Sequence, residues 1–166
     1  MPLIDSQGRV VADHWTWALT ETECPAVSAI VPLERLPGLL ECEPDGRRLG
    51  VFLPAGTQPE AVVPYLDRID VIAVEFPKFR DGRGFSLARS LREHHHFHGE
   101  IRAVGHVLPD QYAALVGVGF TTVQVPEGQA VERWADSLSV PGGHGKKRVS
   151  QLFGRLVGHP AEEGFD

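Results

Sequence analysis

The strongest constraint on the fold is the stretch VIAVEFPKFRDGRGFSLARSLRE at residues 71–93. Its first four residues form a β-branched apolar run, which is typical of a buried strand. From Ser86 onward the apolar residues recur at helical spacing. The loop between the two is basic and rich in glycine: Lys78, Arg80, Gly82, Arg83 and Gly84. The stretch therefore predicts a strand, a basic loop and a helix in direct succession.

The basic loop is a candidate anion-binding site. A helix N-terminus exposes unpaired N–H groups and the positive end of the helix dipole, and Arg offers a planar fork of donors. We expect the five loop residues above and Ser86 to hold a small oxyanion. An equally weighted alternative is that the arginines pair with Asp81, Glu75 or Asp110 and only fix the loop. Neither a GxxxxGK[ST] motif nor a GxGxxG motif follows any predicted strand.

Similar units surround this stretch and predict an α/β fold. Strands at residues 51–53, 101–104 and 121–125 are each followed by a predicted helix, beginning near Thr57, at Pro109 and near Val131. Four consecutive strand–helix units with short connections imply a parallel sheet. The pattern leaves open whether this sheet is of the open flavodoxin or Rossmann type or is half of a barrel.

The domain organisation predicted from the sequence is a single α/β domain over residues 1–138. Within it, residues 1–48 form a β-containing extension and residues 49–138 form the repeated units. Trp15 and Trp17 would share one face of a strand in the extension, where packing is the ordinary role. Residues 139–166 read as a flexible tail with one short helix, which suggests a homodimer contact.

Composition excludes several classes of function. A net charge of −6 argues against a protein that coats nucleic acid, and no apolar run is long enough to span a membrane. The N-terminus lacks the pattern of a signal peptide, and the two cysteines, Cys24 and Cys42, fit reduced thiols of a cytoplasmic protein. Two cysteines cannot ligate a four-thiolate cluster, and no flavin or nicotinamide motif is present, so no cofactor is expected.

Parallel strands place their ligands beyond their carboxyl ends. This rule brings six side chains toward one edge of the sheet: Glu75, Lys78, Arg80, Arg83, His106 and Asp110. His106, directly after a strand, is a candidate general acid or base, with Asp110 as its neighbour. No serine or cysteine nucleophile lies beside it in a recognisable motif.

The run His94–His98 suggests a metal site at first sight. It falls at the C-terminus of the predicted helix, where the dipole favours cations, and no fixed carboxylate or cysteine partner is apparent. We therefore predict no functional metal site.

The segments EFPKFRDGRGFSLARSLRE and GEIRAVGHVLPDQ resemble the domain-of-unknown-function 934 family of bacterial proteins. The resemblance spans roughly residues 28–138, although His106 stands where the family commonly has an acidic residue. It implies an accessory protein of assimilatory sulfite reduction, since the family's genes neighbour those of sulfite reductase. Combined with the basic loop, it predicts binding of sulfite, sulfate or a phosphate-like anion, or of the reductase machinery, through residues 75–86. The alternative that the resemblance implies is an oxidoreductase with an external electron donor.

Overall fold

The computed structural model describes residues 1–20, 28–41 and 48–139. Cys24, Cys42 and the predicted tail beyond Ser139 lie outside the described residues, so the expectations for them stay predictions. Within the described part of the chain, no helix is long and apolar enough to cross a membrane.

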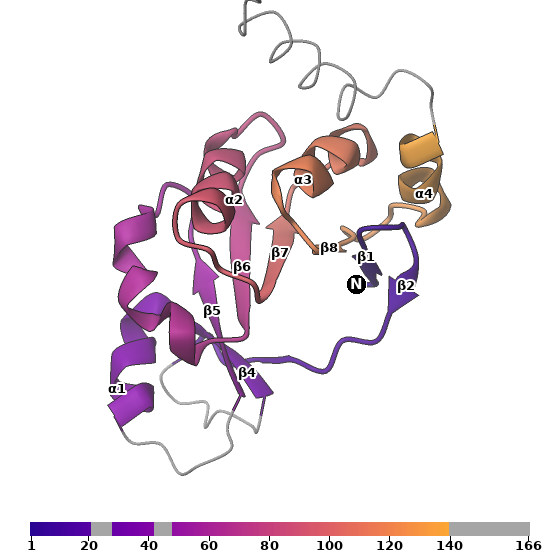
Figure 1. Cartoon of the computed structure of the whole chain (residues 1–166). Coiled ribbons are helices and arrows are strands. Elements are labelled where there is room, and N and C mark those ends of the chain that lie inside the picture. The colour runs from indigo at the N-terminus through magenta and orange to yellow at the C-terminus, as the bar shows by residue number, and fades with distance from the viewer. Residues whose placement is uncertain (21–27, 42–47, 140–166) are drawn as a thin grey trace, which may run out of the picture.

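The core of the fold is a mixed sheet of eight strands in the order β2-β1-β8-β7-β6-β5-β4-β3. The strands are β1 (Leu3–Asp5), β2 (Val10–Val11), β3 (Thr16–Trp17), β4 (Ser28–Pro32), β5 (Arg48–Leu53), β6 (Val71–Phe76), β7 (Glu100–Gly105) and β8 (Thr122–Gln124). Strands β3 to β8 run parallel, whereas β1 pairs antiparallel with both β8 and β2. The sheet curls into an open half-barrel (Figure 1).

This topology corrects the predicted fold in two respects. The sheet is not built from four parallel units alone, because the N-terminal strands join it at both edges. The open flavodoxin or Rossmann alternative is wrong, since that order requires a switch point and here β3 to β8 are neighbours in chain order. The sequence predicts strands in this N-terminal extension but not their places at the two edges of the sheet, because β2 and β3 have only two residues each.

Helices pack against one face of the sheet (Figure 1). The α-helices are α1 (Leu36–Glu41), α2 (Arg83–Glu93), α3 (Tyr112–Val118) and α4 (Glu132–Ser139), and the 3₁₀ helices are η1 (Leu33–Arg35), η2 (Pro59–Ala61), η3 (Val63–Arg68) and η4 (Pro109–Gln111). The single helix predicted from Thr57 is instead the pair η2 and η3. Pro64 lies where a continuous α-helix would need a backbone N–H, which explains the interruption.

Strand alternation divides the sheet residues between two faces. In β6, Ile72, Val74 and Phe76 pack into the main core beneath the helices, while Val71 and Ala73 belong to a smaller cluster on the opposite face. We call this opposite face, the concave side of the half-barrel, the inner face.

A segment without regular structure, residues 12–15, crosses the inner face between β2 and β3, and we call it the strap (Figure 1). Its Trp15 is buried against the smaller cluster, and Trp17 packs there too, which confirms that the two rings share a packing face. Its Asp13 accepts a hydrogen bond at 2.8 Å from the fully buried Arg102 of β7. The strap thus covers part of the inner face, near the amino ends of β5 and β6 and as far as Arg102 of β7.

Tyr112 of α3 fixes the β1–β2 turn against the helices. Its hydroxyl accepts a hydrogen bond from the Gly8 N–H at 2.9 Å and donates one to the Asp5 carbonyl. Its ring stands at 72° to the buried Trp134 ring of α4, with centroids 5.7 Å apart. The N-terminal hairpin is therefore part of the same packed unit as the last described helix.

Candidate functional site

The loop between β6 and α2 projects from the carboxyl edge of the sheet. It is folded by its own backbone, since the Asp81 N–H donates to the Lys78 carbonyl at 3.0 Å. A side chain from another element also holds it, because the Gln111 amide donates to the Phe79 carbonyl at 2.5 Å. The loop is therefore supported from η4 as well as by its two ends.

Five residues around this loop line a cavity of ≈ 300 Å³ that we call the basic pocket: Pro77, Lys78, Phe79, Arg80 and His106. Three of them were predicted site residues, and the fold brings them together from the ends of β6 and β7. Sequence reasoning missed Pro77 and Phe79, the apolar walls. The signal that could have revealed Phe79 is an aromatic residue placed directly between two basic ones.

The basic pocket has little acidic compensation. Within the described part of the chain, neither Arg80 nor His106 forms an ion pair with a carboxylate, and the Arg80 guanidinium lies 5.4 Å from the centroid of the Phe79 ring. Lys78 forms no ion pair there either, although its charge acts at longer range to lower the pKa of Asp81. Cationic groups without carboxylate partners favour an added anion.

Arg83 lies elsewhere and is already paired. Its Nε donates to Asp81 Oδ1 at 2.9 Å and its Nη2 lies 2.5 Å from Oδ2, so the two groups form a forked pair. Hydrogen bonds from the Arg83 side chain and backbone lower the pKa of Asp81 to about 2. For Arg83, the structure matches the loop-fixing alternative.

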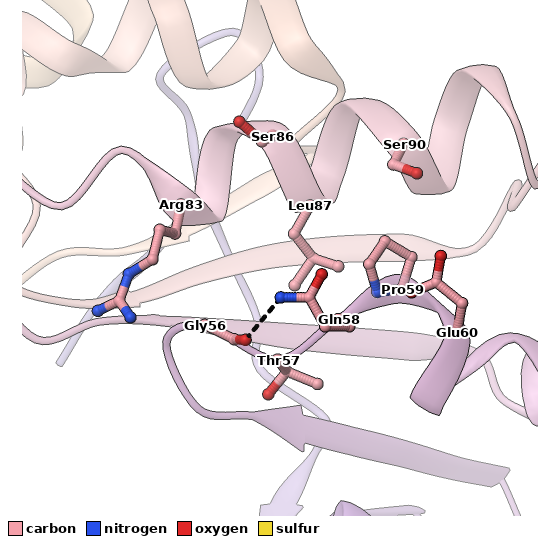
Figure 2. A pocket seen from close by; sticks show the side chains of 9 residues that line it. All are labelled: Gly56, Thr57, Gln58, Pro59, Glu60, Arg83, Ser86, Leu87 and Ser90. Atoms are coloured by element: carbon pink, nitrogen blue, oxygen red, sulfur yellow. Dashed lines mark hydrogen bonds between the residues drawn. The ribbon is translucent and has the colours of Figure 1, made fainter.

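Arg83 and Ser86 line a second cavity, of ≈ 390 Å³, which we call the hydroxyl pocket. Its other walls are residues 56–60, Leu87 and Ser90. Figure 2 shows the Arg83 side chain reaching toward Gly56, whose carbonyl accepts a hydrogen bond from the Gln58 amide at 3.3 Å. The carboxylate of Glu60 and the pairing with Asp81 make this pocket less suited to an anion than the basic pocket.

The two glycines of the loop have different roles. Gly84 is buried in the first turn of α2, and a β-carbon there would lie 2.6 Å from the Phe76 ring. Gly82, the residue before α2, would have nothing within 4 Å of an added β-carbon. Gly84 is thus required for close packing of the helix on β6, a role that was not predicted.

The remaining predicted site residues are separated. Glu75 lies on the inner face, where its Oε2 accepts a hydrogen bond from the Ala55 N–H at 3.3 Å. Asp110 is exposed on η4 and is not among the residues that line the basic pocket. His106 and Asp110 share no hydrogen bond in the described structure, so the geometry does not assemble a catalytic pair from them.

The histidine run follows the end of α2 at the opposite edge of the sheet. His94 caps the helix, and Phe97 is buried between the flanking histidines. In the described ranges, no group of three or more histidine, cysteine or acidic side chains could hold a metal ion.

The fold and the basic pocket define an α/β half-barrel protein with a basic loop at its carboxyl edge. The family model described as "Bacterial protein of unknown function (DUF934)" matches residues 50–149, and the chain belongs to this family. This confirms the resemblance found in the sequence. No curated protein and no solved structure matches the chain significantly.

Proposed function

We propose that the protein binds a small oxyanion in the basic pocket and serves as a cytoplasmic accessory protein of assimilatory sulfite reduction. The observation that carries the binding proposal is the convergence of Lys78, Arg80 and His106 on one cavity without a carboxylate among its lining residues. A tetrahedral or pyramidal anion would accept hydrogen bonds from the Arg80 fork and the Lys78 ammonium. The sulfur context rests on the resemblance of the sequence to a family whose genes neighbour those of sulfite reductase.

The first test is calorimetric titration of the full chain with sulfite, sulfate and phosphate. We expect saturable binding of at least one anion, weakened about tenfold or more by Arg80→Ala, because a hydrogen bond to a charged group contributes about 1.5–3 kcal/mol. Arg89→Ala is the matched control, since Arg89 is an exposed cation whose contact with Glu93 is 3.9 Å long. Absence of heat from all three anions, or equal affinity of the Arg80 variant, would overturn the proposal.

A second pair of variants distinguishes the two pockets. If the anion binds in the basic pocket, Arg83→Ala should leave the affinity nearly unchanged. If it binds in the hydroxyl pocket instead, Arg83→Ala should abolish binding and Asp81→Asn should strengthen it, because Asp81 competes for the same guanidinium.

The exposed Phe79 favours a second candidate function, docking of an acidic protein of the sulfite-reduction machinery. Phe79 is 48% exposed, lies between two cations and sits at the tip of a supported loop. Aromatic and arginine residues together are typical of binding hot spots. Phe79→Ala should then weaken capture of sulfite reductase on the immobilised chain while leaving the heat of anion binding largely intact. Undiminished capture would contradict the docking role.

An oxidoreductase role with an external electron donor stays a prediction. Its test is turnover of sulfite by the purified chain with a reduced dye as donor. Turnover that His106→Ala removes would support it.

A further inference from the structure

The strap covers the inner face only as far as Arg102 and Trp15. The part of the inner face at the carboxyl ends of the strands is lined by other residues. Beyond Arg102 and Trp15 a cavity of ≈ 320 Å³ opens at the carboxyl ends of the parallel strands, and we call it the inner pocket. Its walls come from β3, β5, β6, β7 and β8: Trp17, Phe52, Glu75, Val104, Gly105 and Gln124. In parallel sheets and barrels, this edge is where ligands bind.

The walls of the inner pocket are aromatic and apolar, and some of that apolar surface is exposed. The Trp17 and Phe52 rings stand at 73° with their centroids 6.2 Å apart. Met1 and Leu19, which are 68% and 44% exposed, complete the lining. A volume near 300 Å³ lies at the small end of the range for ligand pockets.

The inner pocket contains one carboxylate, that of Glu75. Glu75 is the only ionisable side chain among the lining residues, and in the described structure it forms no ion pair with the α-ammonium of Met1, which belongs to the same lining. Its Oε2 accepts the Ala55 N–H, whereas no hydrogen bond to Oε1 is found in the described structure. Gln124, the other polar side chain of the lining, offers an amide.

We propose that the inner pocket binds a small organic cation, an amine or amidinium carried on a flat apolar body. The Glu75 carboxylate would accept the N–H donors of the cation, and the π faces of Trp17 and Phe52 would attract its charge and pack against its body. An anion is disfavoured there because it would approach the Glu75 carboxylate, which forms no ion pair in the described structure. The inner pocket therefore selects a ligand of opposite charge to the one proposed for the basic pocket.

This inference is independent of oxyanion binding, because the two pockets share no lining residue. Glu75 points to the inner face, whereas Lys78 and Arg80 belong to the loop beyond the strand. A failure of one site therefore leaves the other untouched, and separate variants test them.

The experiment is an NMR titration of the full chain with benzamidine, following the indole N–H signal of Trp17, which is identified by its loss in Trp17→Phe. Benzamide, the neutral analogue, and benzoate, the anionic one, serve as probes that differ in charge. We expect saturable shifts with benzamidine in about the millimolar range, as suits so small a ligand, about tenfold weaker binding of benzamide and none of benzoate.

Glu75→Gln decides the result. It retains an acceptor for the Ala55 N–H and should remove the preference for benzamidine over benzamide. Glu60→Gln, which neutralises a carboxylate of the hydroxyl pocket, should change nothing. Phe52→Leu, which keeps the apolar volume and removes the ring, should weaken benzamidine several-fold. Equal binding of benzamidine and benzamide by the wild type, full retention of the preference in Glu75→Gln, or no saturable shift with benzamidine would overturn the proposal.

Discussion

Replacing Arg102 by methionine should test how the strap is held on the inner face. Arg102 has only 1% of its side chain exposed, and its Nε and Nη1 donate to Glu100 at 2.9 Å and to Asp13 at 2.8 Å. Thr122 adds a donor to the same Glu100 oxygen at 2.6 Å. The guanidinium thus links the strap to β7 by a hydrogen-bonded ion pair and, through Glu100, to β8.

The size of the effect follows from what each partner would lose. Removing one member of a buried ion pair typically costs about 3–5 kcal/mol, because the remaining charge is left buried and unpaired. Here Glu100 and Asp13 keep 24% and 28% of their side chains exposed, so water can reach both carboxylates after the change. We therefore expect the lower end of that range, about 3 kcal/mol, for Arg102→Met.

Urea unfolding followed by tryptophan fluorescence measures this cost, and thermal unfolding provides a second measure. For a domain of this size, each kcal/mol corresponds to roughly 2–4 °C, so the melting temperature should fall by roughly 6–12 °C. The matched control is Arg89→Met, which removes an exposed arginine from a 3.9 Å contact and should cost no more than about 0.5 kcal/mol.

Two outcomes would refute this reasoning. One is a loss of unfolding free energy in Arg102→Met no greater than the loss in the control Arg89→Met. The other concerns the triple variant Arg102→Met, Glu100→Gln, Asp13→Asn, in which no charge remains unpaired and much of the lost stability should return. If the triple variant is no more stable than Arg102→Met alone, the cost comes from lost packing and not from the buried charges.

Three further predictions concern packing and electrostatics. Gly84→Ala should cost about 1–3 kcal/mol of stability, because the added methyl group would overlap with the buried Phe76 ring. Gly82→Ala should be neutral or stabilising by up to about 1 kcal/mol. Equal urea midpoints of the two variants would contradict this. Tyr112→Phe should cost about 1–3 kcal/mol and speed amide exchange in the β1–β2 turn, because two hydrogen bonds are lost; unchanged exchange would count against it. The pKa of Asp81, followed by carbon-13 NMR, should be about 2 and should return toward about 3.9 in Arg83→Ala. Since its folded pKa is lowered, the contribution of this pair to stability is complete above about pH 4 and is lost as the pH falls through about 2; a midpoint that the substitution does not move would refute the assignment.

The central part of the fold could be predicted from the sequence because its signals are local. The β-branched run of β6 and the helical repeat of α2 lie next to each other, and each element appears within a few residues of its predicted bounds. The position of β1 beside β8 could not be predicted, because these two strands are far apart in sequence, and β3 at the opposite edge has only two residues. Strands of two or three residues carry too little periodicity to reveal such partners.

The candidate site was predicted in part for the same reason. The strand-end rule brought Lys78, Arg80 and His106 to one edge, and the structure places them around one cavity. The rule could not show that Arg83 lies outside the basic pocket, because its pairing with Asp81 depends on side-chain geometry at the start of α2. It also could not place Glu75 on the inner face without the register of β6 against its neighbours.

That register explains how one short stretch of sequence can serve two chemically opposite sites. Successive residues of a strand point to opposite faces, so Val74 enters the core under the helices and Glu75 enters the inner pocket. After Phe76 the chain leaves the sheet, and Lys78 and Arg80 no longer obey the alternation. The carboxylate is therefore fixed by the strand, whereas the two cations are positioned by the loop and its contact with Gln111. It follows that Gln111→Ala should disturb anion binding at the basic pocket and leave the inner pocket intact, and that a change in both would show that the two sites are not positioned separately.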